Sequence, residues 1–168
     1  MYWQDVGELE KEKVERTGQI NMFRAIVPEG LNAIGDDEWE ELEMAMDSGA
    51  TESVVGENML TSVELQEGEA YRRGVRYEVA DGTLISNKGE KRFVGVNEDG
   101  QERKMTVQVC DVNKALLSVK KVVKAGNRVV FEEGSSYVEN VDSGERMYMK
   151  EQDGGMYTLK FWVKRSPF

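Results

Sequence analysis

The sequence predicts a mainly β protein with one short helix, a polar N-terminal arm and a C-terminal β-meander. Short runs rich in β-branched and aromatic residues recur from Leu42 onward, and turns that contain glycine separate them. Apolar residues at a helical spacing interrupt this pattern only in the stretch 113–127. At 168 residues the chain is long enough to bury one hydrophobic core.

Residues 1–38 form an acidic, polar segment that we interpret as an arm or linker. The stretch GELEKEKVERTGQ, residues 7–19, predicts a short solvated helix, and residues 26–41 predict an irregular approach to the first long strand. A propeptide or a docking segment is the alternative. The arm is the simpler interpretation because any exposed helix carries such a run of charges.

Residues 39–126 are predicted to form the core, built from antiparallel strands. Apolar and polar residues alternate at Met105, Val107 and Val109, which is typical of half-buried strands. Asp99 and Gly100 predict the turn of a hairpin. The runs that predict strands are LEMAM, SVVG, RYEVAD, TLISN, KRFVGVNEDG and KMTVQVCDV.

One short helix is expected in the stretch NKALLSVKKVVKAGN, residues 113–127. Its apolar residues on one helical face are Leu116, Val119, Val122 and Val123. Gly126 followed by Asn127 is typical of a helix C-terminus.

Residues 127–168 predict a β-meander that extends the core. Four short strands are expected there. The turns that join them are Glu133–Gly134, Asp142–Gly144 and Asp153–Gly155.

The composition excludes several kinds of chemistry. The chain has no histidine and one cysteine, Cys110, so it can form neither a Ser-His-Asp or Cys-His centre nor a His-rich or multi-cysteine metal site. A net charge of −10 argues against nucleic-acid binding. We expect no cofactor and no metal, and we expect a soluble protein of a reducing, cytoplasmic compartment with no membrane span.

The tripeptide Asp-Ser-Gly occurs twice, at Asp47–Gly49 and at Asp142–Gly144. The second copy lies between two predicted strands and is adequately explained as an ordinary turn. The first copy follows an apolar strand directly and precedes Ala50, Thr51 and a second strand. A given tripeptide occurs by chance in roughly one chain of this length in twenty, so the context of each copy matters more than the tripeptide. A structural role for Asp47 is the alternative to a catalytic one.

The context DSGATESVV resembles the active-site loop of the retropepsins, the dimeric aspartic proteases of retroviruses and retrotransposons. The stretch TVQVCDVNKALLSVKKVV is similar to the family's second apolar strand and the helix that follows it, with Ser118 where retroviral enzymes carry glycine. The stretches VADGTLISNKGEKRFVGV and GMYTL resemble copia-type retrotransposon polyproteins. The resemblance covers about residues 40–163 and implies a closed acid-protease barrel, followed by the strand-rich segment of those polyproteins.

This resemblance implies an aspartic endopeptidase that processes a polyprotein or other peptides. Such an enzyme needs two carboxyl groups that share one proton, and it needs no cofactor. The chain offers one convincing acid for this purpose, Asp47, so the resemblance implies a homodimer in which each copy supplies one carboxyl group. The alternative is a catalytically degenerate or domesticated module that binds or dimerises.

The resemblance also assigns roles to the residues around Asp47. Ser48 would form a hydrogen bond across the two-fold axis, Gly49 would allow close approach of the backbone and the substrate, and Ala50 would leave room beside the acid. Thr51 completes the loop.

Two further groups of residues receive roles in the same way. Leu116, Leu117 and Ser118 would pack beneath the loop. The stretch SNKGEKR, with Asn87, Lys88 and Gly89, would form the tip of the flap over the substrate. It is charged and contains one glycine, whereas retroviral flaps are glycine-rich with apolar tips.

Overall fold

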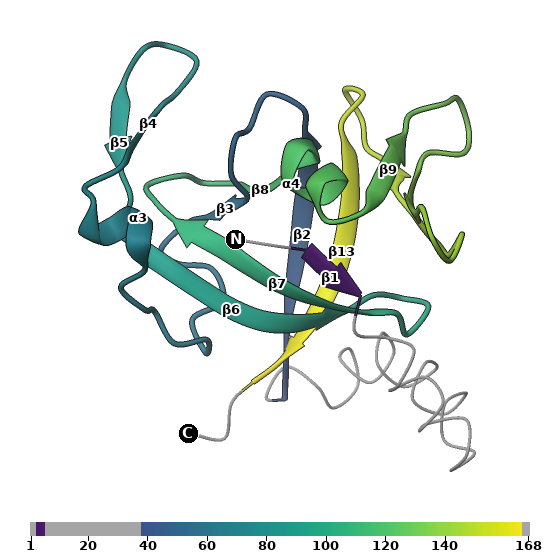
Figure 1. The fold of residues 1–168 in the computed structure, drawn as a ribbon, viewed down its shortest axis with the longest axis horizontal. Helices are drawn as coiled ribbons and strands as arrows, with labels where there is room; N and C mark the ends of the chain where they lie inside the picture. The colour runs from purple at the N-terminus through teal and green to yellow at the C-terminus, as the bar shows by residue number, and fades with distance from the viewer. Residues whose placement is uncertain (1–2, 6–37, 166–168) are drawn as a thin grey trace.

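The computed structural model describes residues 3–5 and 38–165, and it confirms that this part of the chain is mainly β (Figure 1). The helix expected at residues 7–19 lies outside the described residues. The long strands of the main sheet are β2 (Trp39–Asp47), β6 (Gly89–Val96), β7 (Glu102–Val109) and β13 (Tyr157–Lys164). Its shorter strands are β1 (Trp3–Asp5), β3 (Val54–Val55), β8 (Ala115–Ser118) and β12 (Lys150–Glu151).

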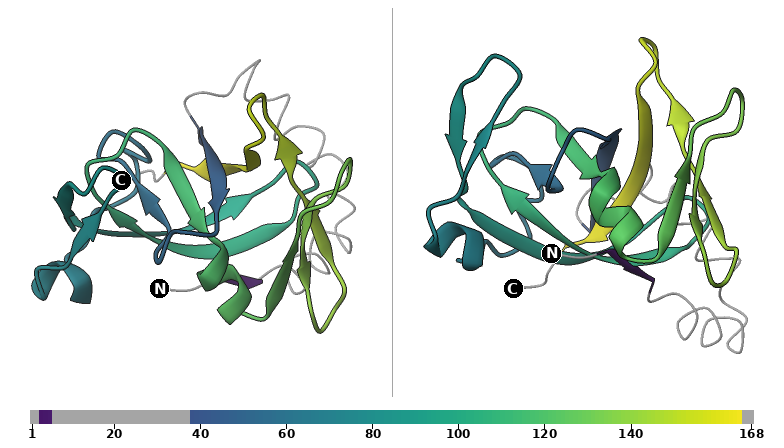
Figure 2. Two further views of the ribbon diagram at one scale, coloured as in Figure 1. Left: turned by 90° about the horizontal axis from the view of Figure 1, so that it is seen from above. Right: turned by 45° about the horizontal axis from the view of Figure 1, so that its top comes forward.

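The remaining described elements are two small sheets and two short helices. Strands β4 (Arg76–Glu78) and β5 (Leu84–Ser86) form a hairpin of their own, and β9 (Asn127–Val130), β10 (Tyr137–Asn140) and β11 (Arg146–Tyr148) form a three-stranded sheet. The helices are α3 (Glu69–Arg72) and α4 (Val119–Lys124). Figure 2 shows the hairpin and the three-stranded sheet at opposite ends of the molecule.

The strands of the main sheet pair in the order β1-β7-β3-β8-β2-β13-β12. Strand β6 pairs with β7 and also with β13, so the hydrogen-bonded pairs run in a ring: β6, β7, β3, β8, β2, β13 and back to β6. In Figure 1, β6 and β7 cross the long strands β2 and β13. The apolar side chains between these crossing strands form the core, with Met44, Met105 and Phe161 among the most deeply buried.

From Met105 to Val109, strand β7 is buried on both faces, although its sequence alternates like that of a half-buried strand. Met105, Val107 and Val109 lie in the core as predicted. Thr106 and Gln108, on the other face, are also buried, at 3% and 5% exposed. The turn predicted at Asp99–Gly100 joins β6 to β7, with Gly100 at a φ of 78°.

The helix begins later in the chain than predicted. The residues that were expected to begin it form strand β8 instead. This strand pairs in parallel with β2, so Leu116 lies opposite Ala45 and Ser118 lies opposite Asp47. The backbone of Ser118 is still extended, and its hydroxyl accepts a hydrogen bond from the Lys121 N–H, which begins helix α4. Pairing with β2 therefore overrides the helical spacing of the apolar residues. The helix ends at Lys124, and Gly126 follows with a φ of 97°, as expected for a stop at this position.

The C-terminal stretch does not form one meander. The predicted strand ERMYMK divides at Met149, whose N–H donates to the Ser136 carbonyl, so that β11 joins the three-stranded sheet and β12 joins the main sheet. Strand β13 pairs with β2 from Thr158 to Lys164. The last long strand of the predicted extension, 127–168, is thus part of the main sheet.

Helix α3, a single turn, was not predicted from the sequence. None of its residues is buried, so no apolar face marks it in the sequence. No helix within the described ranges 3–5 and 38–165 is long and apolar enough to cross a membrane.

Candidate functional site

Strand β2 ends at Asp47, and the carboxylate of this residue organises the loop that follows. The Gly49 N–H donates to Asp47 Oδ1 over 2.8 Å. Asp47 is half-buried, whereas Ser48 and Gly49 are exposed. Within the described part of the chain, Asp47 Oδ2 accepts no hydrogen bond, so one carboxylate oxygen holds the turn and the other remains available to a ligand.

Ser118 holds this loop from below. Its hydroxyl donates to the Ala50 carbonyl over 2.7 Å, and its N–H donates to Ser53 Oγ over 2.9 Å. Ser118 is fully buried. Of its two predicted companions, Leu117 points into the core, whereas Leu116 is half-buried and lines the cleft above.

A cleft of about 930 Å³ lies between this loop and the β4–β5 hairpin. That volume is within the range of small-molecule and cofactor sites. The loop side includes Asp47, Gly49, Ala50, Thr51 and Glu52. The hairpin side includes the stretch from Arg76 to Gly82 together with Ile85. The hairpin stands clear of the main sheet at the upper left of Figure 1.

The prediction that Asn87, Lys88 and Gly89 form the tip of a flap is wrong about their position. Asn87 and Lys88 connect β5 to β6 at the base of the hairpin, where Asn87 is buried and Lys88 forms an ion pair with Glu57, and Gly89 is the first residue of β6. Gly89 is needed there because its φ is 132° and a Cβ would lie 2.7 Å from the Gln66 carbonyl oxygen. The tip is instead the turn between Val79 and Thr83.

The sequence did contain a signal for this turn. Asp81 is the last residue of the run RYEVAD and Gly82 separates it from TLISN, and an Asp-Gly pair where two strand-like runs meet is typical of a hairpin. In the structure Gly82 has a φ of 87°, and the Gly82 N–H donates to the Val79 carbonyl. The hairpin that covers the cleft could therefore have been placed correctly from the sequence.

The carboxylates of the cleft differ in their partners. Glu52 forms an ion pair with Lys121 at 3.3 Å. Asp81 accepts hydrogen bonds from Thr83, which lower the pKa of the exposed Asp81 carboxyl group. Asp47 has neither a cationic partner nor a side-chain donor among the described residues. Among the described residues Asp47 is thus the carboxylate of the loop without a cationic partner, while Glu52 Oε2 is buried without a hydrogen bond.

The two Asp-Ser-Gly tripeptides form different structures. At residues 142–144 the turn is organised by Asn140, whose Oδ1 accepts from the Asp142 and Ser143 N–H groups, while Asp142 itself is exposed. Gly144 has a φ of 76°, as predicted for a turn glycine. Gly49 does not have a positive φ. Asp47 lines the cleft beside the β4–β5 hairpin, and Asp142 does not.

These two glycines allow a paired test of the loop. A Cβ on Gly49 would meet Asp47 Oδ1 at 3.4 Å, an ordinary contact, so we expect Gly49→Ala to change the free energy of unfolding by no more than about 0.5 kcal/mol. The same methyl group would stand beside the carboxylate and hinder a ligand or a second chain, so the peptide cleavage that the resemblance implies should fall.

Gly144→Ala should lower the stability of the protein and leave cleavage unchanged. Because the φ of Gly144 is positive, alanine at this position should reduce the free energy of unfolding by roughly 1–2 kcal/mol, although nothing crowds the site. Thermal denaturation and a peptide-cleavage assay on both variants check this pair. Equal cleavage by the two variants would contradict the role given to Gly49.

Cys110 also lines the cleft, but its thiol is not activated. The residue is 1% exposed, and burial, reinforced by the charge of Asp111, raises the pKa of the thiol to about 11. The thiol is therefore protonated near neutral pH and is a poor nucleophile.

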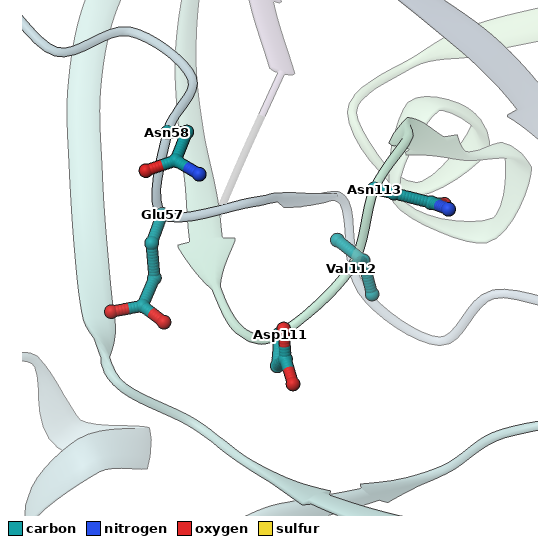
Figure 3. A pocket seen from close by; sticks show the side chains of 5 residues that line it. All are labelled: Glu57, Asn58, Asp111, Val112 and Asn113. Carbon is teal, nitrogen blue, oxygen red and sulfur yellow. The ribbon is translucent and has the colours of Figure 1, made fainter.

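A second hollow, of about 760 Å³, lies beside the start of β8 and is lined by Glu57, Asn58, Asp111, Val112 and Asn113 (Figure 3). Glu57 is already paired with Lys88, and Figure 3 shows Asn113 pointing away from Glu57. No three cysteine, aspartate or glutamate side chains gather as a metal site anywhere in the described ranges.

Comparison of the chain with protein-family models, with curated proteins and with solved structures finds no match in any of the three. The features of the chain that bear on its function are therefore the cleft and the residues around Asp47.

Proposed function

We propose that the chain is an aspartic endopeptidase of the retropepsin type. The observation that carries this proposal is the position of Asp47 at the end of β2, in parallel register with Ser118, on an exposed loop that borders a cleft of about 930 Å³. The ring of strand pairs that includes β2 and β8 supports a closed barrel of the acid-protease type. The substrate is a peptide or polyprotein.

The second carboxyl group of the dyad comes from another copy of the chain. Glu52 is paired with Lys121, and Glu78 and Asp81 belong to the hairpin on the opposite side of the cleft. A two-fold axis beside the loop would bring the Asp47 residues of two copies together. Ser48 and Gly49 are exposed in the single chain, and this leaves them free to meet the partner loop.

The dyad would act by sharing a single proton. The ionised Asp47 accepts a proton from a water molecule as the water oxygen attacks the scissile carbonyl carbon, and the protonated Asp47 of the partner subunit donates to the carbonyl oxygen. The tetrahedral intermediate then collapses: the C–N bond breaks as Asp47 passes the proton taken from water to the amine nitrogen, and a hydroxyl group of the intermediate returns a proton to the partner's Asp47, which restores the single proton of the dyad. The two carboxyl groups titrate as a pair, and the need to keep one proton favours acidic to neutral pH.

A catalytically degenerate module that binds or dimerises is the second candidate. The observation in its favour is the polar character of the hairpin, which carries Arg76, Glu78 and Asp81. Closure of a hairpin with these charges over an apolar peptide is less favourable than closure of an apolar hairpin. Such a module would keep the dimer and lose the cleavage.

A mixing experiment tests the dimeric endopeptidase. Equal amounts of wild-type and Asp47→Asn chains, allowed to exchange subunits, should form about one quarter wild-type dimers, so activity should fall to about a quarter of that of the same total amount of wild-type chain. If each chain acted alone, activity would fall only to about half. Sedimentation at micromolar concentration should show a dimer, and a transition-state-like inhibitor of aspartic proteases should block cleavage. A wild type that cleaves neither itself nor a peptide library would support the binding module instead.

A further inference from the structure

A series of buried and partly buried hydrogen bonds connects the loop of Asp47 to the hairpin on the other side of the cleft. On the loop side, the Ser118 hydroxyl donates to the Ala50 carbonyl, and the Ser118 N–H donates to Ser53 Oγ. The Ser53 carbonyl then accepts from the Gln108 N–H over 2.8 Å. Ser118, Ser53 and Gln108 are all buried.

Asn87 continues this series from the sheet into the hairpin. Its Nδ2 donates to Gln108 Oε1 over 2.7 Å and to Tyr77 Oη over 2.9 Å. Its Oδ1 accepts from the Gly89 N–H, and its own N–H donates to the Val75 carbonyl. The hydrogen-bonding groups of Asn87 are thus engaged with β7, with the hairpin and with the start of β6.

Tyr77 ends this series at the cleft. It belongs to β4, lines the cleft opposite the loop, and is half-buried. Its phenolic oxygen accepts from Asn87, and within the described part of the chain its own hydrogen has no acceptor. A phenol whose lone pair is occupied in this way presents its O–H as a donor.

We propose that Asn87 and Gln108 are positioning residues that set the hairpin against the Asp47 loop, and that Tyr77 donates its phenolic hydrogen to a backbone carbonyl of a peptide in the cleft. This inference rests on the proposed endopeptidase. A displacement of the hairpin would break a bond to a buried partner, and buried polar networks of this kind hold one arrangement because a broken bond leaves an unsatisfied group.

Tyr77→Phe is the decisive variant, because it removes one oxygen from a half-buried side chain and leaves the ring in place. We expect kcat/KM for a cleaved peptide to fall about tenfold, the effect of losing one hydrogen bond. Amide hydrogen exchange in residues 76–86 should become faster, while exchange in β6 and β7 stays unchanged. Tyr71→Phe, on the exposed helix α3, is the matched control and should change neither measurement.

Asn87→Asp tests the positioning step separately. It keeps the acceptor for the Gly89 N–H and removes both donors. Burial raises the pKa of Tyr77, and the hydrogen bond from Asn87 opposes this rise. Loss of that bond and the new carboxylate charge beside the phenol should both raise the pKa of Tyr77 further, as read by ultraviolet difference titration. If this variant does not fold, Tyr77→Phe still decides the question.

The outcomes separate this inference from the proposed function. If Tyr77→Phe had the same kcat/KM as the wild type, or the same rate of amide hydrogen exchange in the hairpin, the inference would be overturned. The proposed endopeptidase would not be affected. A wild-type chain that cleaves no peptide would overturn the endopeptidase and, with it, the ligand contact. Faster hairpin exchange in Tyr77→Phe would in that case still support the positioning role of Asn87.

Discussion

Asp47→Asn is expected to lower the rate of peptide cleavage by about 10²- to 10⁴-fold, the usual contribution of a general acid or base. An amide can neither take the proton of the attacking water nor share a proton with its partner. Asparagine keeps an oxygen that can accept from the Gly49 N–H, so the loop should retain its shape and the melting temperature should change little. Cleavage of a peptide substrate by purified protein, measured across acidic to neutral pH, checks the result.

Asp142→Asn provides the control within the same chain. Asp142 has the same two following residues, is exposed, and lies in a turn that Asn140 organises. We expect its cleavage rate to equal that of the wild type. If both variants lose activity equally, or if neither does, the assignment of Asp47 as the catalytic residue is refuted.

Ser118→Ala is expected to reduce the free energy of unfolding by about 1–3 kcal/mol. The hydroxyl donates to the Ala50 carbonyl and also accepts from the Lys121 N–H at the start of α4, so its removal costs a helix cap and a buried hydrogen bond together. Chemical denaturation measures the change. Cleavage should fall as well, because the loop that carries Asp47 loses its support.

Ser143→Ala is the matched control for this prediction. Ser143 belongs to the second tripeptide, is exposed, and accepts only from the Glu145 N–H among the described residues. Its free energy of unfolding should change by about 0.5 kcal/mol or less. Ser118→Gly would introduce the residue that retroviral enzymes carry, yet it should destabilise this chain at least as much as Ser118→Ala. If Ser118→Ala and Ser118→Gly were as stable as the wild type, the two hydrogen bonds of the Ser118 hydroxyl would contribute little to the free energy of unfolding.

Local sequence was sufficient wherever a single residue decides the backbone. Gly100 and Gly126 take positive φ at the predicted turn and at the predicted helix stop. The alternation at Met105, Val107 and Val109 correctly gave the core face of β7. Asp47 was also located correctly at the end of a strand, because an apolar run leads directly into it.

Predictions failed where a distant partner decides the structure. Leu116 has the spacing of a helical residue but lies in β8, because β2 offers a parallel partner. Asn87 lies in a polar stretch with the composition of a loop tip, but its side chain is buried and donates hydrogen bonds to Gln108 and Tyr77. The turn at residues 142–144 is held by Asn140 and not by the aspartate itself.

The sequence by itself determined a mainly β chain without histidine, with one cysteine and with two copies of one tripeptide, of which the first resembles the active-site loop of the retropepsins. Only the tertiary structure decided which segments surround that loop. It brought Ser118 beneath Asp47 and the hairpin of Tyr77 across from it, and it paired β13 with β2. The physical reason is that strand pairing and buried hydrogen bonds join residues far apart in the chain, and residue spacing along one segment contains no information about its partner.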